Sequence, residues 1–418
     1  MSDNFQDRVV VVGAGIVGLC VAYEVRKAGF EVTVIDPNPV ASQCSSGNAG
    51  AISSRAVAPL AMPGLMKTVP SMLLDPSSPL YIPANYILSA APWLMKFIAS
   101  AKPERVREIA AGLNLLHDGA VKHHQALAEE VGCRDRVRAT GQLYLYVDDN
   151  ALAKDQGSWA LKKSYGLIAE ELDRRGIESL EPEVSARYQR GLFLPDQGWV
   201  SEPLEYARCI ETAARSRGVR FIEASVERIT RDGGMACVQM QGQQLRASHV
   251  VLAAGAWSSK LLSSSFDISV PLESQRGYHV QMKLPGVSLS RQVVLADRKV
   301  FVTPMEKGLR FAGTVEFGGL EREPNPRRAM ILAKHALEAL PALSPDAPLE
   351  TWMGHRPCFP DSLPAIGPVP YQPGIWCAFG HGHLGLTGSA KTGKLIAGLL
   401  KGRIKKDLVS PFAVERFV

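Results

Sequence analysis

Apolar and polar positions form their clearest pattern between residues 8 and 36. Val9–Val12 is an uninterrupted β-branched run, which is typical of a strand buried on both faces. Apolar residues then recur at helical spacing as far as Gly29, a residue type that commonly ends a helix. A second apolar run, Glu31–Ile35, leads to Asp36. The pattern predicts a strand, a helix and a second strand that pairs with the first in a parallel sheet.

The same two periodicities divide the rest of the chain. Helical spacing predicts helices at residues 104–131, 160–175, 203–217 and 327–339. Apolar runs and alternation predict strands at residues 141–147, 191–200, 219–224, 250–254, 272–318 (several antiparallel strands) and 374–380. A glycine-rich turn and a final helix follow. We therefore expect an α/β fold in which a discontinuous Rossmann-type domain receives an inserted antiparallel-sheet α+β domain.

The composition is that of a folded protein with more than one core. The chain has 418 residues, of which 46% are hydrophobic and 21% are charged. The formal net charge of +6 comes from scattered basic residues, which argues against nucleic-acid binding. Seven cysteines without a CxxC pair indicate a reducing compartment and argue against a structural metal or an iron–sulfur cluster. We expect neither a signal peptide nor a spanning helix, and hence a cytoplasmic protein.

Gly13, Gly15 and Gly18 follow the first predicted strand in the order GxGxxG. In such a motif the first glycine permits a tight turn, the second lets the backbone approach a pyrophosphate, and the third allows close helix packing. The helix N-terminus offers N–H groups to the phosphates, and Asp36 is placed to accept the ribose hydroxyls. Its carboxylate would repel a 2′-phosphate, which disfavours NADP. The motif alone does not distinguish FAD from NAD.

Two stretches allow alternative interpretations. Residues 62–102 contain apolar pieces cut by prolines, for which buried packing is expected. The alternative is a shallow membrane-contacting patch, helped by Lys67, Lys96 and Lys102. For the histidines of the predicted helix 104–131 we favour packing or surface positions over a metal site; these are His117, His123 and His124.

Five motifs together resemble one family. They are GAGIVG with Asp36, SSGNAGAIS, VVLAAGAWS, WMGHRPCFPDSLPAIG and FGHGHLGLTGSAKTGKLIAGLL. In this order, and over nearly the whole chain, they are similar to the FAD-dependent D-amino-acid oxidase superfamily, and most similar to its bacterial D-amino-acid dehydrogenase branch. The resemblance implies an FAD-binding domain formed by residues 1–80, 190–270 and 350–418. It implies a substrate domain formed by residues 81–189 and 271–349.

The resemblance also implies which positions contact FAD. They are Gly13, Ala14, Gly15, Ile16, Val17, Gly18, Asp36, Pro37, Ser45, Ser46, Asn48, Ala49, Gly50, Ile52, Val226, Ala254, Gly255, Trp257, Gly380, His381, Gly382, His383, Leu384, Gly385 and Thr387. The small residues of the last loop let backbone N–H groups approach a flat ring, and the following helix directs its positive end there. We expect no metal between His381 and His383.

Two residues are candidates for the catalytic site. Arg356, in GHRPCFPD, matches the family's carboxylate-binding arginine, and its planar guanidinium fits a carboxylate bidentately. The alternative is a structural ion pair with Asp361. Tyr278, in QRGYHV, matches a strand tyrosine that reaches the substrate pocket, with core packing as the alternative. Arg276 and His279 are weaker candidates.

The resemblance implies oxidation of a D-amino acid by hydride transfer from the α carbon to flavin N5. The imino acid would hydrolyse to a 2-oxo acid and ammonia, and electrons would pass to a quinone-type acceptor. We expect no catalytic base, because orientation and flavin polarisation supply most of the rate. Alternatives are a D-proline or cis-4-hydroxy-D-proline dehydrogenase, a sarcosine- or glycine-type oxidase that uses dioxygen, a flavin-bearing subunit of a larger complex, and a NAD-dependent dehydrogenase. Contact with the inner face of a bacterial inner membrane is a further expectation.

Overall fold

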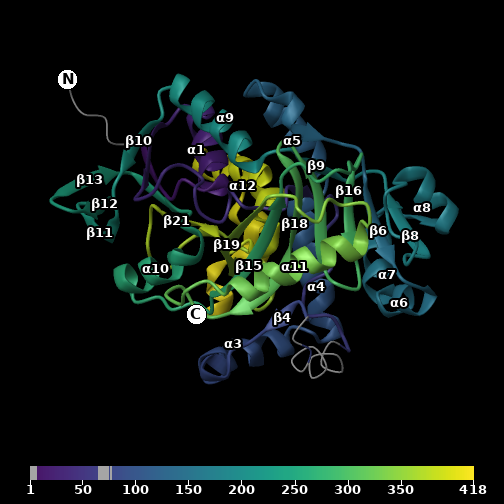
Figure 1. Cartoon of the computed structure of the whole chain (residues 1–418). Coiled ribbons are helices and arrows are strands. Elements are labelled where there is room, and N and C mark those ends of the chain that lie inside the picture. Colours follow the sequence, from purple (N-terminus) through teal and green to yellow (C-terminus); the bar gives the residue numbers. More distant parts are fainter. Residues whose placement is uncertain (1–6, 65–74, 76–77) are drawn as a thin grey trace.

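A computed structural model describes residues 7–64, 75 and 78–418, and it contains two main sheets (Figure 1). The first has six strands in the order β10–β2–β1–β14–β21–β20, parallel except that β20 is antiparallel to β21. Val9, Val10 and Val11 are 0% exposed at its centre, as an uninterrupted apolar run predicts. The strands are Arg8–Val12 (β1), Glu31–Asp36 (β2), Arg220–Glu223 (β10), His249–Leu252 (β14), Ala365–Pro368 (β20) and Ile375–Phe379 (β21).

The second sheet has nine strands. Eight follow the order β19–β15–β18–β17–β16–β6–β8–β7, and β4 pairs with β18. All pairs are antiparallel except β16–β6 and β18–β4. The strands are Leu80–Tyr81 (β4), Gln142–Tyr146 (β6), Glu170–Leu172 (β7), Arg190–Leu194 (β8), Glu273–Met282 (β15), Gln292–Leu295 (β16), Val300–Met305 (β17), Gly308–Phe317 (β18) and Leu349–Cys358 (β19). A parallel sheet with a second, mostly antiparallel sheet confirms the expected fold class.

Two three-stranded sheets complete the β structure of the residues that the structure describes. One consists of Ala51–Ile52 (β3), Val137–Arg138 (β5) and Gly198–Val200 (β9), and it lies beside the loop that follows β2. The other consists of Val226–Asp232 (β11), Met235–Met240 (β12) and Gln243–Ala247 (β13). The turn between β11 and β12 contains Gly233 and Gly234, both with positive φ, as is common in tight hairpin turns.

Helices cover both main sheets. On the parallel sheet α1 packs against α9 and α12, and α12 also contacts α4 and α5. On the large sheet α11 packs against β15 and β18. The helices are Ile16–Lys27 (α1), Ile87–Ala99 (α3), Pro103–His117 (α4), Ala120–Glu130 (α5), Asp149–Lys154 (α6), Gln156–Ser164 (α7), Arg174–Leu180 (α8), Pro203–Ser216 (α9), Ser258–Phe266 (α10), Pro326–Ala339 (α11) and Gly385–Leu400 (α12).

Two predicted helices were wrong in their extent. The single helix expected at 104–131 is two helices, α4 and α5, because the chain breaks at Asp118 and at Gly119, whose φ is +66°. The helix expected at 160–175 ends at Ser164, and Gly166, with φ of +84°, turns the chain into β7. Glycine at a left-handed position overrides the apolar spacing in both places.

The predicted domain boundaries cut through the large sheet. Both β8 and β19 fall in segments assigned to the FAD-binding domain, at 190–270 and 350–418, yet both strands hydrogen-bond into the nine-stranded sheet. Conversely, α4 and α5 fall in segment 81–189 and pack into the core cluster of α1, α9 and α12. The division of the chain into two domains stays a prediction. In the structure, β8 and β19 belong to the large sheet, and α4 and α5 pack with the helices of the parallel sheet.

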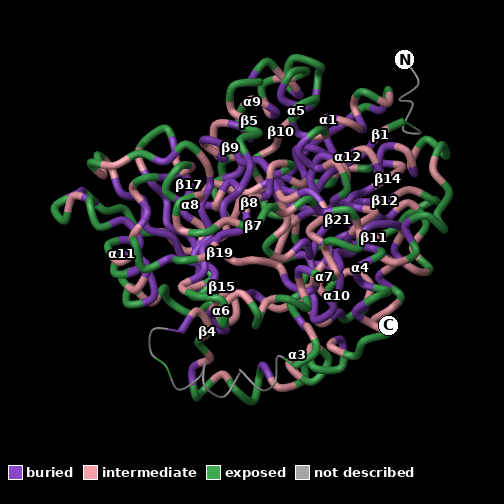
Figure 2. The backbone as a smooth tube through the Cα atoms, turned by 90° about the vertical axis from the view of Figure 1, so that its right-hand side faces the viewer, coloured by how far each residue is buried: buried purple, intermediate pink, exposed green. Residues whose placement is uncertain are grey.

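Residues 62–102 include α3, which lies at the periphery of the molecule (Figure 2). Trp93 packs inward, while Leu88 and Met95 are 87% and 65% exposed. The expected buried packing therefore holds for one side of the helix, and the membrane-contacting patch stays a prediction for the exposed side. Lys67 lies outside the described residues. None of the helices that the structure describes is long and apolar enough to cross a membrane.

The contact between α1 and α12 yields a test of the core. A Cβ added at Gly393 on α12 would lie 2.5 Å from the Cys20 carbonyl oxygen on α1. Because backbone cannot give way there, Gly393→Ala should destabilise the protein by about 1–3 kcal/mol. Gly157→Ala, on α7 with nothing within 4 Å of the added carbon, is the control and should leave the protein unchanged or slightly stabilised. Thermal unfolding of both variants measures the effect, and equal midpoints would contradict the packing argument.

Candidate active site

The turn between β1 and α1 is built for a close approach. Gly13 has φ of +111°, and a Cβ there would lie 2.4 Å from the Ala253 carbonyl oxygen. A Cβ at Gly18 would lie 2.0 Å from the Gly13 carbonyl oxygen. The Asp36 carboxylate accepts hydrogen bonds from the backbone N–H of Ala14 at 2.7 Å and of Asn38 at 2.9 Å. These contacts orient the carboxylate, which lines a cavity.

The loop that follows β2 lies between the two main sheets. Ser45 Oγ accepts a hydrogen bond from the Ile16 N–H at the start of α1, at 3.0 Å. On the other side, Arg310 of β18 donates to the Asn48 carbonyl at 2.7 Å, and Thr303 of β17 donates to the Ala49 carbonyl at 2.7 Å. The loop is therefore fixed by both sheets, and it brings its residues to their junction.

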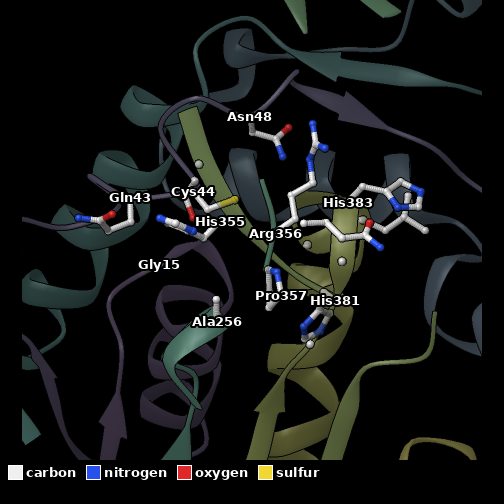
Figure 3. A pocket seen from close by; sticks show the side chains of 18 of the residues that line it. Gly15, Gln43, Cys44, Asn48, Ala256, His355, Arg356, Pro357, His381 and His383 are labelled. Atoms are coloured by element: carbon white, nitrogen blue, oxygen red, sulfur yellow. The ribbon is translucent and has the colours of Figure 1, made fainter. Parts of the chain in front are cut away.

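One cavity of about 980 Å³ runs through this junction. Of the predicted cofactor residues it is lined by Gly13, Gly15, Ile16, Val17, Asp36, Pro37, Ser45, Asn48, Ala49, Val226, Ala254, Gly255, Trp257, Gly380, His381, Gly382, His383, Leu384, Gly385 and Thr387. The remaining five do not line the cavity: Ala14, Gly18, Ser46, Gly50 and Ile52. In Figure 3, Gly15, Cys44 and His355 lie toward one side of the cavity and His381 and His383 toward the other.

The loop before α12 and the first turn of that helix line another part of the cavity. Thr387 Oγ1 donates to the Ala51 carbonyl and accepts from the Ser53 N–H, both at 3.2 Å. His381 Nε2 lies 2.9 Å from Thr392 Oγ1, and burial lowers the pKa of His381 to about 3. Burial also lowers the pKa of His383 to about 4, with a smaller contribution from Arg356. Both imidazoles are therefore neutral near pH 7. No cluster of three metal-ligating side chains occurs in the described ranges.

Arg356 extends from β19 across β15 to β18. Its guanidinium occupies the space that a side chain at Gly277 would fill, since a Cβ there would lie 2.1 Å from Arg356 Cζ. Nη1 donates to the Thr314 carbonyl at 2.8 Å and Nη2 to the Gly313 carbonyl at 3.3 Å. Burial lowers its pKa, and within residues 7–64, 75 and 78–418 it has no carboxylate partner within 4 Å. Such a guanidinium is suited to bind an anion.

A backbone irregularity creates the partners of Arg356. The pairing of β15 with β18 shifts register between Arg276 and Tyr278, so that β18 contains a bulge. Thr314 within it has φ of +59°, which is unusual for a β-branched residue and costs about 1–3 kcal/mol. The bulge turns two successive carbonyls toward the guanidinium. The alternative role for Arg356 as partner of Asp361 does not occur, because Asp361 pairs with Arg416 at 2.8 Å.

Tyr278 has a different position from Arg356. It is 3% exposed and packs in the core of the large sheet, although it also contributes to the cavity lining. Its hydroxyl donates to the buried Glu316 carboxylate and accepts from the Asn325 N–H at 2.9 Å. Arg276, 0% exposed, lies 3.9 Å from the same carboxylate. These contacts leave the Tyr278 hydroxyl already hydrogen-bonded within the protein.

Sequence reasoning missed several residues of the cavity. Gln275 pairs directly with Arg356 across the β15–β19 ladder, lines the cavity and is 5% exposed. Its side-chain amide has no hydrogen-bond partner among the described residues. Cys44 and His355 also line the wall, and burial raises the pKa of the Cys44 thiol. No motif marks Gln275; only the strand register puts it beside Arg356.

The glycine turn after β1 and Asp36 are typical of a dinucleotide-binding fold, and the cavity that they line extends to Arg356. Residues 8–399 match the family described as FAD dependent oxidoreductase, or DAO, and the chain belongs to this family. Its cofactor is therefore FAD, as expected from the sequence.

The chain is similar to several named proteins. It is 38% identical over 417 residues to a D-amino-acid oxidase of Bradyrhizobium diazoefficiens, covering 98% of this chain and 99% of the relative. It is 28% identical over 418 residues to a D-amino acid dehydrogenase of the same species, covering 98% and 99%. Glycine oxidase from Geobacillus kaustophilus has a TM-score of 0.76 at 22% identity, covering 99% of this chain and 100% of the other. This last similarity shows the fold alone. The expected dehydrogenase branch stays a prediction, because the relative named an oxidase is the more similar of the first two.

The residues present fit FAD. The cavity volume of about 980 Å³ is at the upper end of the range of ligand pockets, roughly 300–1,000 Å³. Gly13, Gly15 and Asp36 would hold the ADP half, because the glycines open the backbone and the carboxylate lies at the wall. The loop 380–387 would hold the ring at the other end.

A buried histidine links this loop to its support and predicts a pH dependence. His124 on α5 lies 2.8 Å from the Leu386 carbonyl through Nε2 and 3.0 Å from the Tyr206 hydroxyl through Nδ1. Burial lowers its pKa from 6.5 to about 4. Because the folded pKa is the lower one, its contribution to stability is complete above about pH 6.5 and is lost as the pH falls through about 4.

Urea unfolding of the holoenzyme between about pH 4.5 and 7.5 tests this prediction, because this range covers most of the interval between the two pKa values and extends above the higher one. In His124→Gln the free energy of unfolding should fall less steeply with decreasing pH, by at most about 1.4 kcal/mol per pH unit. His123→Gln, at a partly exposed position on the same helix, should change the slope less. Identical slopes for His124→Gln and the parent protein would contradict a neutral, buried His124.

Proposed function

We propose that this FAD-dependent enzyme oxidises D-amino acids and that Arg356 binds the substrate carboxylate. One observation carries the proposal: a half-buried guanidinium that lines the cavity and is held by the carbonyls of Gly313 and Thr314. Carbonyls fix its direction without neutralising its charge. The relatives named D-amino-acid oxidase and D-amino acid dehydrogenase, which match along nearly their whole length, support the substrate class.

The chain's own residues would bind and orient the substrate. The planar fork of Arg356 can donate a hydrogen bond to each carboxylate oxygen, and the free amide of Gln275 can hydrogen-bond the same carboxylate or the amine. FAD, when bound, supplies the two-electron acceptor. Among the described residues of the cavity wall, Asp36 is the single acid, and it lies at the α1 end. The lining next to Arg356 therefore offers no carboxylate base, which supports catalysis by orientation.

The net reaction removes a hydride from the α carbon and a proton from the amine. The product is an imino acid, which water converts to a 2-oxo acid and ammonia. A neutral amine is required, because an ammonium group has no electron pair with which to form the C=N bond. The fixed positive charge of Arg356 and the neutral state of His381 and His383 suit a substrate with an anionic carboxylate and an uncharged amine.

For the electron acceptor we propose a quinone at a membrane surface. The support is α3, whose outer side exposes Leu88 and Met95 while its inner side lines the cavity through Trp93 and Phe97. The relative named an oxidase favours dioxygen as the alternative. Stopped-flow reoxidation of the reduced holoenzyme by dioxygen and by a soluble quinone distinguishes the two acceptors.

The experiment that tests the function is an anaerobic screen of the flavin absorbance of the holoenzyme. D-amino acids should bleach the band near 450 nm, roughly the position expected for an oxidised flavin. L-enantiomers, sarcosine and glycine should bleach it much more slowly. Bleaching by sarcosine or glycine alone would overturn the proposal in favour of another member of the family, and bleaching by D-proline alone would restrict it to cyclic substrates.

The role of Arg356 has its own test. Arg356→Ala removes two charge-assisted hydrogen bonds and should lower kcat/KM for a D-amino acid about 100-fold or more, mainly through KM. FAD should stay bound, because the residue lies at the substrate end of the cavity. Arg105→Ala, an exposed arginine that contacts Asp361, is the matched control and should retain activity. Loss of FAD with unchanged kinetics per bound flavin would exclude carboxylate binding by Arg356.

A further inference from the structure

The cavity continues beyond Arg356 into an apolar space beneath α3. We call it the α3 chamber and define it by Trp93, Leu94, Phe97, Val315 and Phe317, all of which line the cavity. Trp93 is fixed by a hydrogen bond from Nε1 to the Cys358 carbonyl at 3.1 Å. Its ring lies 5.4 Å from Phe317 in an edge arrangement and 5.1 Å from Phe97 in a stack. The chamber therefore has a fixed aromatic wall.

The strand register places the chamber next to the anion site. On β15, Gln275 pairs with Arg356 of β19 on one side and with Phe317 of β18 on the other. Directly paired residues point to the same face of a sheet, so the guanidinium and the phenyl ring flank one amide. Val315 follows Thr314, whose carbonyl accepts the hydrogen bond from Arg356. A molecule whose carboxylate is bound by Arg356 would therefore lie next to the chamber, because Val315 of the chamber directly follows Thr314.

None of the five described residues that define the α3 chamber is charged, whereas another part of the described cavity wall carries a charge. Lys299 lines the cavity beside Phe301 and forms an ion pair with Asp155 at 3.1 Å. The carboxylate of an acidic substrate side chain could compete with Asp155 for Lys299. In the α3 chamber the same carboxylate would lose its water and find no charged partner. An aromatic or branched aliphatic side chain would instead exchange water for aromatic contacts.

We propose that the α3 chamber is the side-chain subsite and that it selects D-amino acids with bulky apolar side chains over small and acidic ones. The inference rests on the proposed function and names the substrate class of that site. Burying an apolar side chain of the size of Leu or Phe corresponds to a preference of about 10-fold to 100-fold in kcat/KM over a substrate that lacks it.

The first measurement compares substrates on the holoenzyme. D-phenylalanine and D-leucine should show kcat/KM values about 10-fold or more above that of D-alanine, and D-aspartate should be the poorest of the four. A preference for D-aspartate would indicate that the substrate side chain binds beside Lys299 and not in the α3 chamber, and it would overturn the proposal. Equal values for D-phenylalanine and D-alanine would also overturn it.

The second measurement uses the two sides of α3. Phe97→Ala enlarges the chamber and should lower kcat/KM for D-phenylalanine about 10-fold while changing D-alanine less than about 2-fold. Leu94→Trp fills the chamber and should exclude D-phenylalanine but retain D-alanine. Met95→Ala, on the exposed side of the same helix, is the matched control and should leave both substrates unchanged.

The outcomes separate this inference from the function on which it rests. If Phe97→Ala lowers kcat/KM equally for D-phenylalanine and D-alanine, the chamber is not the side-chain subsite, although D-amino-acid oxidation stands. If the parent holoenzyme is bleached by none of the four D-amino acids, both the function and the subsite are overturned. Retention of the substrate preference in Leu94→Trp would likewise exclude the chamber, because that variant keeps the helix and changes only the space beneath it.

Discussion

The site depends on a half-buried guanidinium, that of Arg356, which has no counter-charge among the described residues. Arg356 can lie across β15 only because position 277 is glycine, and it is held only because the bulge in β18 turns the carbonyls of Gly313 and Thr314 toward it. An acid in place of those carbonyls would neutralise the charge and compete with any carboxylate ligand. The strained φ of Thr314 is consistent with a backbone shaped for this purpose, since strain of this kind persists where the surrounding structure imposes it.

The second constraint is the loop between the sheets. Ser45 contacts the start of α1, whereas Asn48 and Ala49 are held by side chains of the large sheet. The same loop therefore contacts the dinucleotide motif and the strands that carry Arg356. His279 adds a further link, because its Nδ1 lies 2.9 Å from the Gly47 carbonyl and its ring stacks on Trp352. Side chains on the large sheet thus set the distance between the two halves of the cavity.

How much of this the sequence could predict depends on how local the signal is. The β1–α1–β2 unit and Asp36 were predictable, because glycine positions and apolar periodicity report local geometry directly. The interruption of the predicted helix 104–131 was missed, since Gly119 looks like an ordinary helical glycine until its φ is known. Gln275 was missed for a different reason: a lone glutamine in a strand carries no pattern, and its role follows from long-range register.

Tyr278 and α3 show the same limit in other forms. A resemblance aligns Tyr278 with a pocket position, but it does not reveal that Glu316 and Asn325 already bond its hydroxyl. In α3 nearly every position is apolar, so no hydrophobic stripe identifies the inner side. Only tertiary packing shows that Trp93 and Phe97 face the cavity while Leu88 and Met95 face outward.

The electrostatics of the cavity follow from which groups can hold a charge there. Burial lowers the pKa values of His279, His381 and His383 far enough that all three are neutral across the physiological range. Lys299 is paired with Asp155, so among the described residues of the wall the unneutralised positive charge belongs to Arg356, and the start of α12 adds a partial one. A guanidinium does not titrate near neutral pH. The attraction for an anionic ligand is therefore fixed by the fold and does not vary with the protonation of the surrounding histidines.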